Sequence, residues 1–132
     1  KLDNGTSISL DSDARLMGYV GHNLYFDSPD TFFDSKRIKS AIGKGVYAVG
    51  CITARDFLPR MLVPNVKGLL FTTSLMAPEG YTTLALLDSI AQAHNGRQMV
   101  EHANNAYRYF QTLGGQKQPG NLFVNEAVGA HR

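Results

Sequence analysis

The sequence is poor in the patterns that mark several common protein classes. Cys51 is the single cysteine among 132 residues, so an internal disulfide and a zinc site made of paired cysteines are both excluded. No apolar run approaches the roughly 18 to 20 residues that cross a bilayer. The first residues also lack the shape of a signal peptide. We therefore expect an intracellular protein, cytoplasmic or nuclear, with no membrane partner.

Motifs of nucleophilic and phosphate-binding enzymes are missing as well. The sequence has no Gly-x-Ser-x-Gly, and Cys51 lies in an apolar run, which favours a small core residue over an activated thiolate. Gly43 and Gly45 follow a helix-like segment instead of preceding one, so they do not form a phosphate-binding loop. The four histidines have no metal-binding spacing. Whether the protein is an enzyme stays open at this point.

Charge is nearly balanced overall but unevenly distributed. Residues 1–34 hold six of the eleven acidic residues and two basic ones, whereas residues 35–132 hold eleven basic and five acidic residues. A cationic body is compatible with a polyanionic partner such as nucleic acid. An ordinary solvated surface explains the same distribution.

A central stretch predicts a strand, a helix and a second strand. Leu24–Asp27 alternates as a short strand, and Ser28-Pro29-Asp30 has the residues of a helix start. Gly43 and Gly45 end that helix, and Val46–Thr53 is a continuous apolar run typical of a central strand covered on both faces. The connecting helix is long enough for a parallel crossover, although antiparallel pairing is not excluded.

The rest of the chain supplies further elements around this centre. We expect a strand at Thr6–Leu10, a brief helix through Arg15–Tyr19, a short helical turn within residues 54–65, a strand at Val66–Leu75 and two helices separated by Asn95-Gly96. Together these predict one α/β domain over residues 1–132, with a small mixed or parallel sheet flanked by helices. Residues 1–20 would form a docking arm, and residues 114–132 a loosely packed C-terminal segment.

The acids after the first predicted strand are candidates for metal binding. Asp27 ends that strand, and Asp30 and Asp34 follow closely. Carboxylates gathered at such an edge suit Mg²⁺ or Mn²⁺, since these hard cations prefer oxygen ligands. In the alternative interpretation, Asp30 only caps a helix and Asp34 lies on its surface.

Basic residues nearby are candidates for contacts with a phosphate backbone. They lie on the predicted helix and beyond the second strand: Lys36, Arg37, Lys39, Lys44, Arg55 and Arg60. Such contacts would give salt-dependent binding without sequence readout. A solvated helix face is the competing explanation.

The same stretch resembles a known family. The segments Gly21–Asp27, Phe32–Ser35 and Gly45–Ile52, followed by Arg55 and Leu58-Pro59, are similar to the region around the second catalytic aspartate of piggyBac-type transposases. The alignment needs three extra residues after Asp27, unless Asp30 is the equivalent acid, and one fewer before Pro59. A weaker likeness covers Asn95–Asn105, where Glu101 takes the place of the third catalytic aspartate.

This resemblance implies an RNase H-like fold in which carboxylates hold two divalent metal ions for DNA strand transfer. Asp27 or Asp30 would be a metal ligand, Glu101 its partner, and Lys36, Arg37, Lys39 and Arg55 nucleic-acid contacts. The first aspartate of the family has no counterpart here, so the resemblance implies a fragment that is not catalytically complete alone.

A different class of function competes with this one. The chain could be a non-enzymatic binding or assembly module, acting as a homo-oligomer or within a larger protein assembly. Its contact surface would be the apolar patch around Phe57, Met61 and Leu62, or the C-terminal helix.

Overall fold

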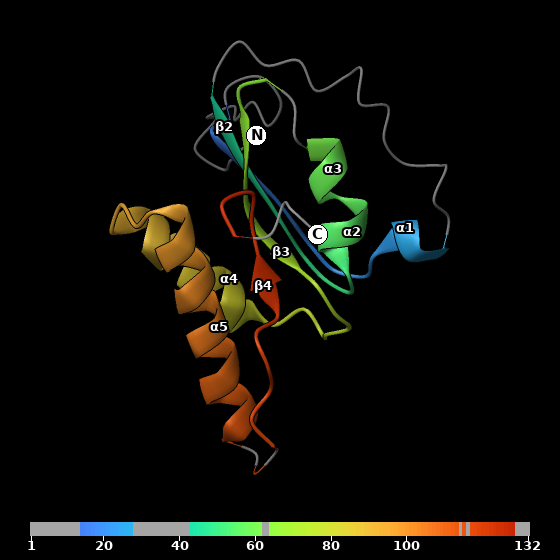
Figure 1. Cartoon of the computed structure of the whole chain (residues 1–132), viewed down its shortest axis with the longest axis vertical. Helices are drawn as coiled ribbons and strands as arrows, with labels where there is room; N and C mark the ends of the chain where they lie inside the picture. Colours follow the sequence, from blue (N-terminus) through green and yellow to red (C-terminus); the bar gives the residue numbers. More distant parts are fainter. Residues whose placement is uncertain (1–13, 28–42, 62–63, 114, 116, 129–132) are drawn as a thin grey trace, which may run out of the picture.

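The computed structural model describes residues 14–27, 43–61, 64–113, 115 and 117–128. Its centre is a four-stranded mixed sheet in the order β1-β2-β3-β4 (Figure 1). The strands are β1 Leu16–Val20, β2 Lys44–Val49, β3 Val66–Thr72 and β4 Phe123–Val124. β1, β2 and β3 are parallel, and β4 pairs antiparallel with β3. The expected single α/β domain with a mixed sheet is confirmed.

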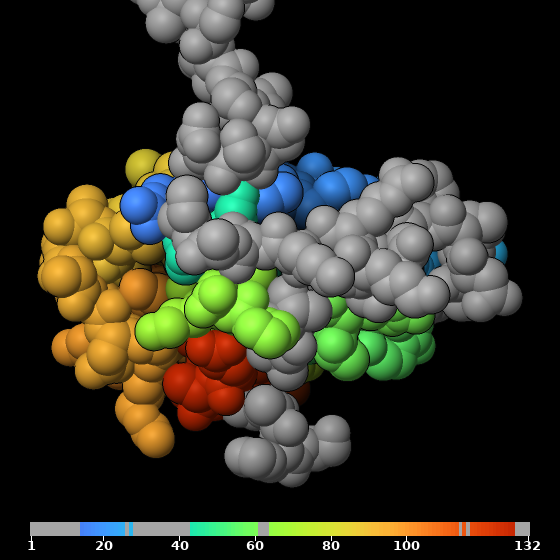
Figure 2. Space-filling model, turned by 90° about the horizontal axis from the view of Figure 1, so that it is seen from above, coloured from blue at the N-terminus to red at the C-terminus, as the bar shows by residue number. Residues whose placement is uncertain are grey.

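Helices cover both faces of this sheet. They are α1 Leu24–Asp27, α2 Thr53–Asp56, α3 Leu58–Met61, α4 Gly80–Ala91 and α5 Gly96–Thr112. Figure 2 shows orange α5 and green α2 and α3 on opposite sides, with red β4 between them. No helix in the described part of the chain is long and apolar enough to span a membrane.

Side-chain alternation along β2 divides the core into two clusters. Val46 and Ala48 face the short helices, where Phe57 and Leu58 pack. Val49 faces the other way, into a cluster that includes Leu86 of α4 and Val100 and Ala103 of α5. Because both faces are covered, β2 consists of mostly buried residues. The expected central strand is therefore confirmed, although it ends at Val49 and not at Thr53.

The predictions for two elements near the start of the described chain are wrong. Leu16–Val20 is strand β1 where a brief helix over Arg15–Tyr19 was predicted, and Leu24–Asp27 is the helical turn α1 where a strand was predicted. Pairing with β2 decides the first case. In the second, the Asn23 side chain accepts a hydrogen bond from the Tyr25 amide at 3.1 Å, which favours a turn over an extended chain.

The remaining elements follow the predictions more closely. The third strand is present but ends at Thr72, both C-terminal helices form, and residues 54–65 contain short helices. Leu122 and Phe123 are buried in the core, so the C-terminal segment packs more tightly there than expected. The predicted strand at Thr6–Leu10 and the helix after Ser28 lie outside the described residues.

Candidate active site

Two adjacent parallel strands end in the same short pattern. β1 runs into Val20-Gly21-His22, and β2 runs into Val49-Gly50-Cys51. Val20 pairs with Val49, and the Gly21 amide donates to the Val49 carbonyl at 3.1 Å. His22 and Cys51 thus leave neighbouring strands at the carboxyl edge of the sheet. In open α/β sheets this edge is where ligands bind.

Gly50 allows the two strand ends to approach closely. A Cβ atom at this position would lie 2.3 Å from the carbonyl oxygen of Gly21, a distance that backbone atoms do not tolerate. Any larger residue at position 50 would push the chain after β1 away from the chain after β2. The separation of His22 and Cys51 therefore depends on this glycine.

A buried asparagine connects the two strand ends. Asn23 has no exposed surface, and its amide nitrogen lies 2.6 Å from the carbonyl oxygen of Cys51 and 2.8 Å from a carboxylate oxygen of Asp56. Its side-chain oxygen accepts from the Tyr25 amide. One side chain therefore fixes the loop that carries His22 to the loop that carries Cys51.

His22 has a carboxylate partner of its own. Its Nε2 atom lies 2.5 Å from Oδ2 of Asp27, which α1 brings back toward the strand end. Both side chains are more than half exposed. A carboxylate on Nε2 favours the tautomer that carries its proton there, which leaves Nδ1 as a proton acceptor. Asp27 therefore orients the imidazole.

Cys51 is half-buried, and its thiol donates to the carbonyl of Met76 at 3.3 Å. Met76 belongs to the core cluster that includes residues of α4 and α5, whereas the imidazole of His22 is bound to Asp27 of α1. Ile52 then takes a left-handed conformation with φ 52°, and its amide donates to the Ser74 carbonyl. This turn separates Cys51 from the start of α2.

Chemically, the ends of β1 and β2 supply a thiol, an imidazole and a carboxylate bound to the imidazole, and these groups can serve as nucleophile, base and orienting group. These three roles are the ones needed for covalent acyl transfer. Hydrogen bonds of such a set are often formed only with substrate present. In the structure the Cys51 thiol is bound to the Met76 carbonyl and the His22 imidazole to Asp27.

The basic residues expected to contact phosphate are bound to other groups, are buried, or lie outside the described residues. Arg55 binds both carboxylate oxygens of Asp56, at 2.8 and 2.9 Å. The hydrogen bond from Arg55 holds the pKa of the Asp56 carboxyl below its usual value, and the bond from Asn23 lowers it further against the opposing effect of burial. Lys44 is buried, with 7% of its surface exposed. Lys36, Arg37 and Lys39 lie outside the described residues.

The structure does not bring the expected metal ligands together. Asp27 lies on α1 and Glu101 on α5, and Figure 1 places these helices on opposite sides of the sheet. Asp30 lies outside the described residues. Among the residues that are described, no three histidine, cysteine, aspartate or glutamate side chains are arranged to hold an ion. A Mg²⁺ or Mn²⁺ site including Asp30 stays a prediction.

Comparison with known proteins gives no further guidance. No family model matches the chain, and neither a curated protein nor a solved structure is significantly similar to it. The likeness to piggyBac-type transposases therefore also stays a prediction.

The placement of His22 and Cys51 after adjacent parallel strands was missed at the level of sequence. Placing the first strand at Leu24–Asp27 put His22 before the strand, at the wrong edge of the sheet. The available signal was the repeated Val-Gly dipeptide, which precedes His22 once and Cys51 once.

Proposed function

We propose that this chain carries the active site of a thiol-dependent hydrolase that acts on an amide or ester carbonyl. One observation carries the proposal: His22 and Cys51 leave adjacent parallel strands at the same edge, with Asp27 bound to the imidazole. Cys51 is the nucleophile, His22 the base and acid, and Asp27 the group that orients it.

The reaction follows from these roles. His22 takes the thiol proton at Nδ1, and the Cys51 sulfur attacks the carbonyl carbon of the substrate. As the bond to the leaving nitrogen or oxygen breaks, the imidazolium returns the proton to it, which leaves a thioester on Cys51. A water molecule then gives a proton to His22 and attacks the thioester, so that a carboxylic acid and the free thiol are formed.

The single cysteine makes the proposal easy to test. Incubation with p-nitrophenyl acetate should add one acetyl group to Cys51, seen by intact-mass spectrometry together with an initial burst of one nitrophenolate per chain. His22→Ala should slow acetylation by about two orders of magnitude, the lower end of what general-base catalysis contributes. His94→Ala is the matched control, since His94 lies at the start of the α5 region, and should acetylate at the rate of the unmodified protein.

Equal acetylation rates in the unmodified protein and in His22→Ala would refute the assigned base. Asp27→Asn should give an intermediate rate, because the imidazole loses its charged partner but keeps its position. Cys51→Ser should abolish the thioester.

Exposed apolar side chains favour a second candidate, the assembly module. Leu84 and Leu87 on α4 are 66% and 42% exposed, and Tyr109 and Leu113 at the end of the α5 region are 61% and 64% exposed. The prediction that Phe57 belongs to an exposed contact patch is wrong. Phe57 is only 5% exposed and packs against the rings of Tyr19 and Tyr25. A homo-oligomer in analytical ultracentrifugation that Leu84→Glu dissolves would support this candidate.

A transposase-derived fragment that binds DNA and divalent metal ions remains a further proposal. It rests on the sequence resemblance around Asp27 and on Lys36, Arg37, Lys39 and Arg55. It requires salt-sensitive DNA binding that the double substitution Lys36→Ala and Arg37→Ala abolishes. Absence of binding at low salt would end it.

A further inference from the structure

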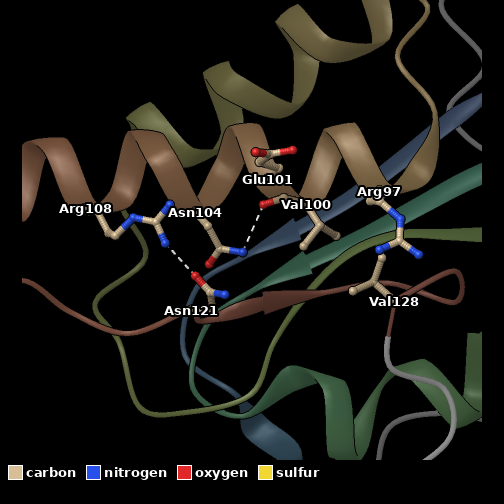
Figure 3. Close-up of a pocket in the computed structure, with 7 residues that line it drawn as sticks. All are labelled: Arg97, Val100, Glu101, Asn104, Arg108, Asn121 and Val128. Atoms are coloured by element: carbon tan, nitrogen blue, oxygen red, sulfur yellow. Dashed lines mark hydrogen bonds between the residues drawn. The ribbon is translucent and has the colours of Figure 1, made fainter.

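A pocket lies beside β4, which is separated by β3 from the strand that leads to Cys51. It has a volume of about 270 Å³ and lies between α5 and the segments on either side of β4 (Figure 3). In the strand order β1 and β4 are the two outer strands, and the candidate active site follows β1 and β2, so the pocket beside β4 is separate from it.

A positively charged side chain that has no carboxylate partner among the described residues lies at one end of this pocket. Arg108 donates to the side-chain oxygen of Asn121 at 2.5 Å and to that of Asn105, and both acceptors are neutral. The ion pairs in the described part of the chain involve neither Arg108 nor Arg97, which lines the other end. Within the described residues, the guanidinium of Arg108 is thus held by two neutral side chains and forms no ion pair.

Hydrogen bonds of Asn104 connect α5 to the chain at β4 behind Arg108. Asn104 is 4% exposed, and its side-chain oxygen accepts from the amides of Leu122 and Phe123 at 2.7 and 3.1 Å. Its amide nitrogen donates to the Val100 carbonyl at 3.0 Å. Asn104 therefore fixes the pocket without being available to a ligand. Asn121 differs: its oxygen is bound by Arg108, so its amide group can donate to a ligand.

The rest of the lining restricts what can bind. Val100 and Val128 supply an apolar surface between the two arginines, and Glu101 adds a negative charge at the rim (Figure 3). An ion with one planar anionic group matches the donors of Arg108 and Asn121. A second negative charge would meet Glu101. A short aliphatic chain would cover the valines.

We infer that this pocket binds a small aliphatic monocarboxylate. Its carboxylate lies on Arg108 and Asn121, and its hydrocarbon part lies on Val100 and Val128. The site is independent of the hydrolase proposed above, because none of its residues lies on β1 or β2 or in the segments that follow them.

Titration of the full chain with isovalerate tests this inference, followed by ¹H–¹⁵N NMR and calorimetry. Saturable binding with shifts at Val100 and Val128 is expected, whereas isovaleramide and inorganic phosphate should bind at least tenfold more weakly. Arg108→Met should weaken isovalerate binding about tenfold or more, which is the value of a hydrogen bond to a charged group. Arg15→Ala, a change on the exposed side chain before β1, is the matched control and should bind normally.

Asn121→Ala provides a second variant that keeps the arginine, and it should weaken isovalerate binding several-fold. Equal binding of isovaleramide or phosphate would overturn the assignment of a carboxylate ligand. Unchanged binding by Arg108→Met, or no saturation with isovalerate, would overturn the site itself.

Discussion

A buried asparagine lies beside each of the two outer strands of the sheet, Asn23 after β1 and Asn104 next to β4, but the two asparagines have different partners. Asn104 on α5 accepts from the main-chain amides of Leu122 and Phe123, which are themselves core residues. Asn23, after β1, binds one main-chain carbonyl, one carboxylate and a nearby amide. The first side chain connects a helix to a strand, whereas the second connects two loops.

Because of this difference, we expect the two asparagines to affect different properties of the protein, its stability in one case and the candidate active site in the other. A buried main-chain amide that loses its acceptor carries the full cost of desolvation, since water does not reach it. The partners of Asn23 lie next to an exposed histidine and a half-buried cysteine, where solvent can replace part of what is lost. We therefore expect Asn104 to determine whether the protein folds, and Asn23 to determine how His22 lies relative to Cys51.

The largest effect should come from Asn104→Ala. Two buried amides, those of Leu122 and Phe123, lose their acceptor, so the free energy of unfolding should fall by about 2 to 4 kcal/mol. Urea denaturation followed by circular dichroism measures this change. Asn105→Ala is the matched control on the exposed side of the same helix and should cost less than about 1 kcal/mol. A similar cost for both variants would remove the distinction between the two edges.

Gly50→Ala should have the next largest effect, at the other edge. The added methyl group would meet the Gly21 carbonyl at 2.3 Å, and a forced backbone shift of this kind costs about 1 to 3 kcal/mol. Acetylation of Cys51 should slow as well, because the strand ends separate. Gly80→Ala is the control, since an added Cβ there has open space around it. If Gly50→Ala were as stable as Gly80→Ala, the close approach of the strand ends would be wrong.

Asn23→Ala should lower the free energy of unfolding by about 1 to 2 kcal/mol, less than Asn104→Ala. The cost is smaller because water can replace Asn23 at some of its hydrogen-bond partners. Its effect on Cys51 acetylation should be larger than its effect on stability suggests. Measuring both in one preparation sharpens the comparison, with Leu24→Ala, an exposed neighbour, as the control. Normal acetylation in a folded Asn23→Ala protein would show that Asn23 has no part in positioning His22.

Some of this organisation could be predicted from sequence because it is local. The apolar run of β2 indicated a central strand, and Asn95-Gly96 marked the break between the two long helices. In the structure Asn95 caps α5, with its side chain and that of Gln98 exchanging hydrogen bonds with the backbone. Such signals need only residues that are near each other in the chain.

The position of the first strand could not be predicted in the same way. Leu24–Asp27 alternates as well as Leu16–Val20 does, and pairing with the distant β2 decides between them. The error moved His22 to the wrong edge, and the apolar run hid the fact that Cys51 lies beyond the end of β2 at Val49. The candidate site depends on this pairing, so it became visible only in three dimensions.

The smallest predicted effect concerns acid stability at the β1 and β2 edge. The pKa of Asp56 is lowered in the folded protein, first by the hydrogen bond from Arg55 and also by that from Asn23, and its side chain is only 13% exposed. Its ionised form therefore stabilises the fold above the unfolded value of about 4, and this contribution is lost as the pH falls through the lower folded pKa. Urea denaturation from pH 7 to pH 2 should show Asp56→Asn less stable than the unmodified protein at neutral pH, with the difference shrinking below about pH 4. Asp88→Asn on α4 is the control from the other face of the sheet. A difference that stays constant down to pH 2 would mean that the lost side-chain hydrogen bonds, and not the charge of Asp56, stabilise this edge.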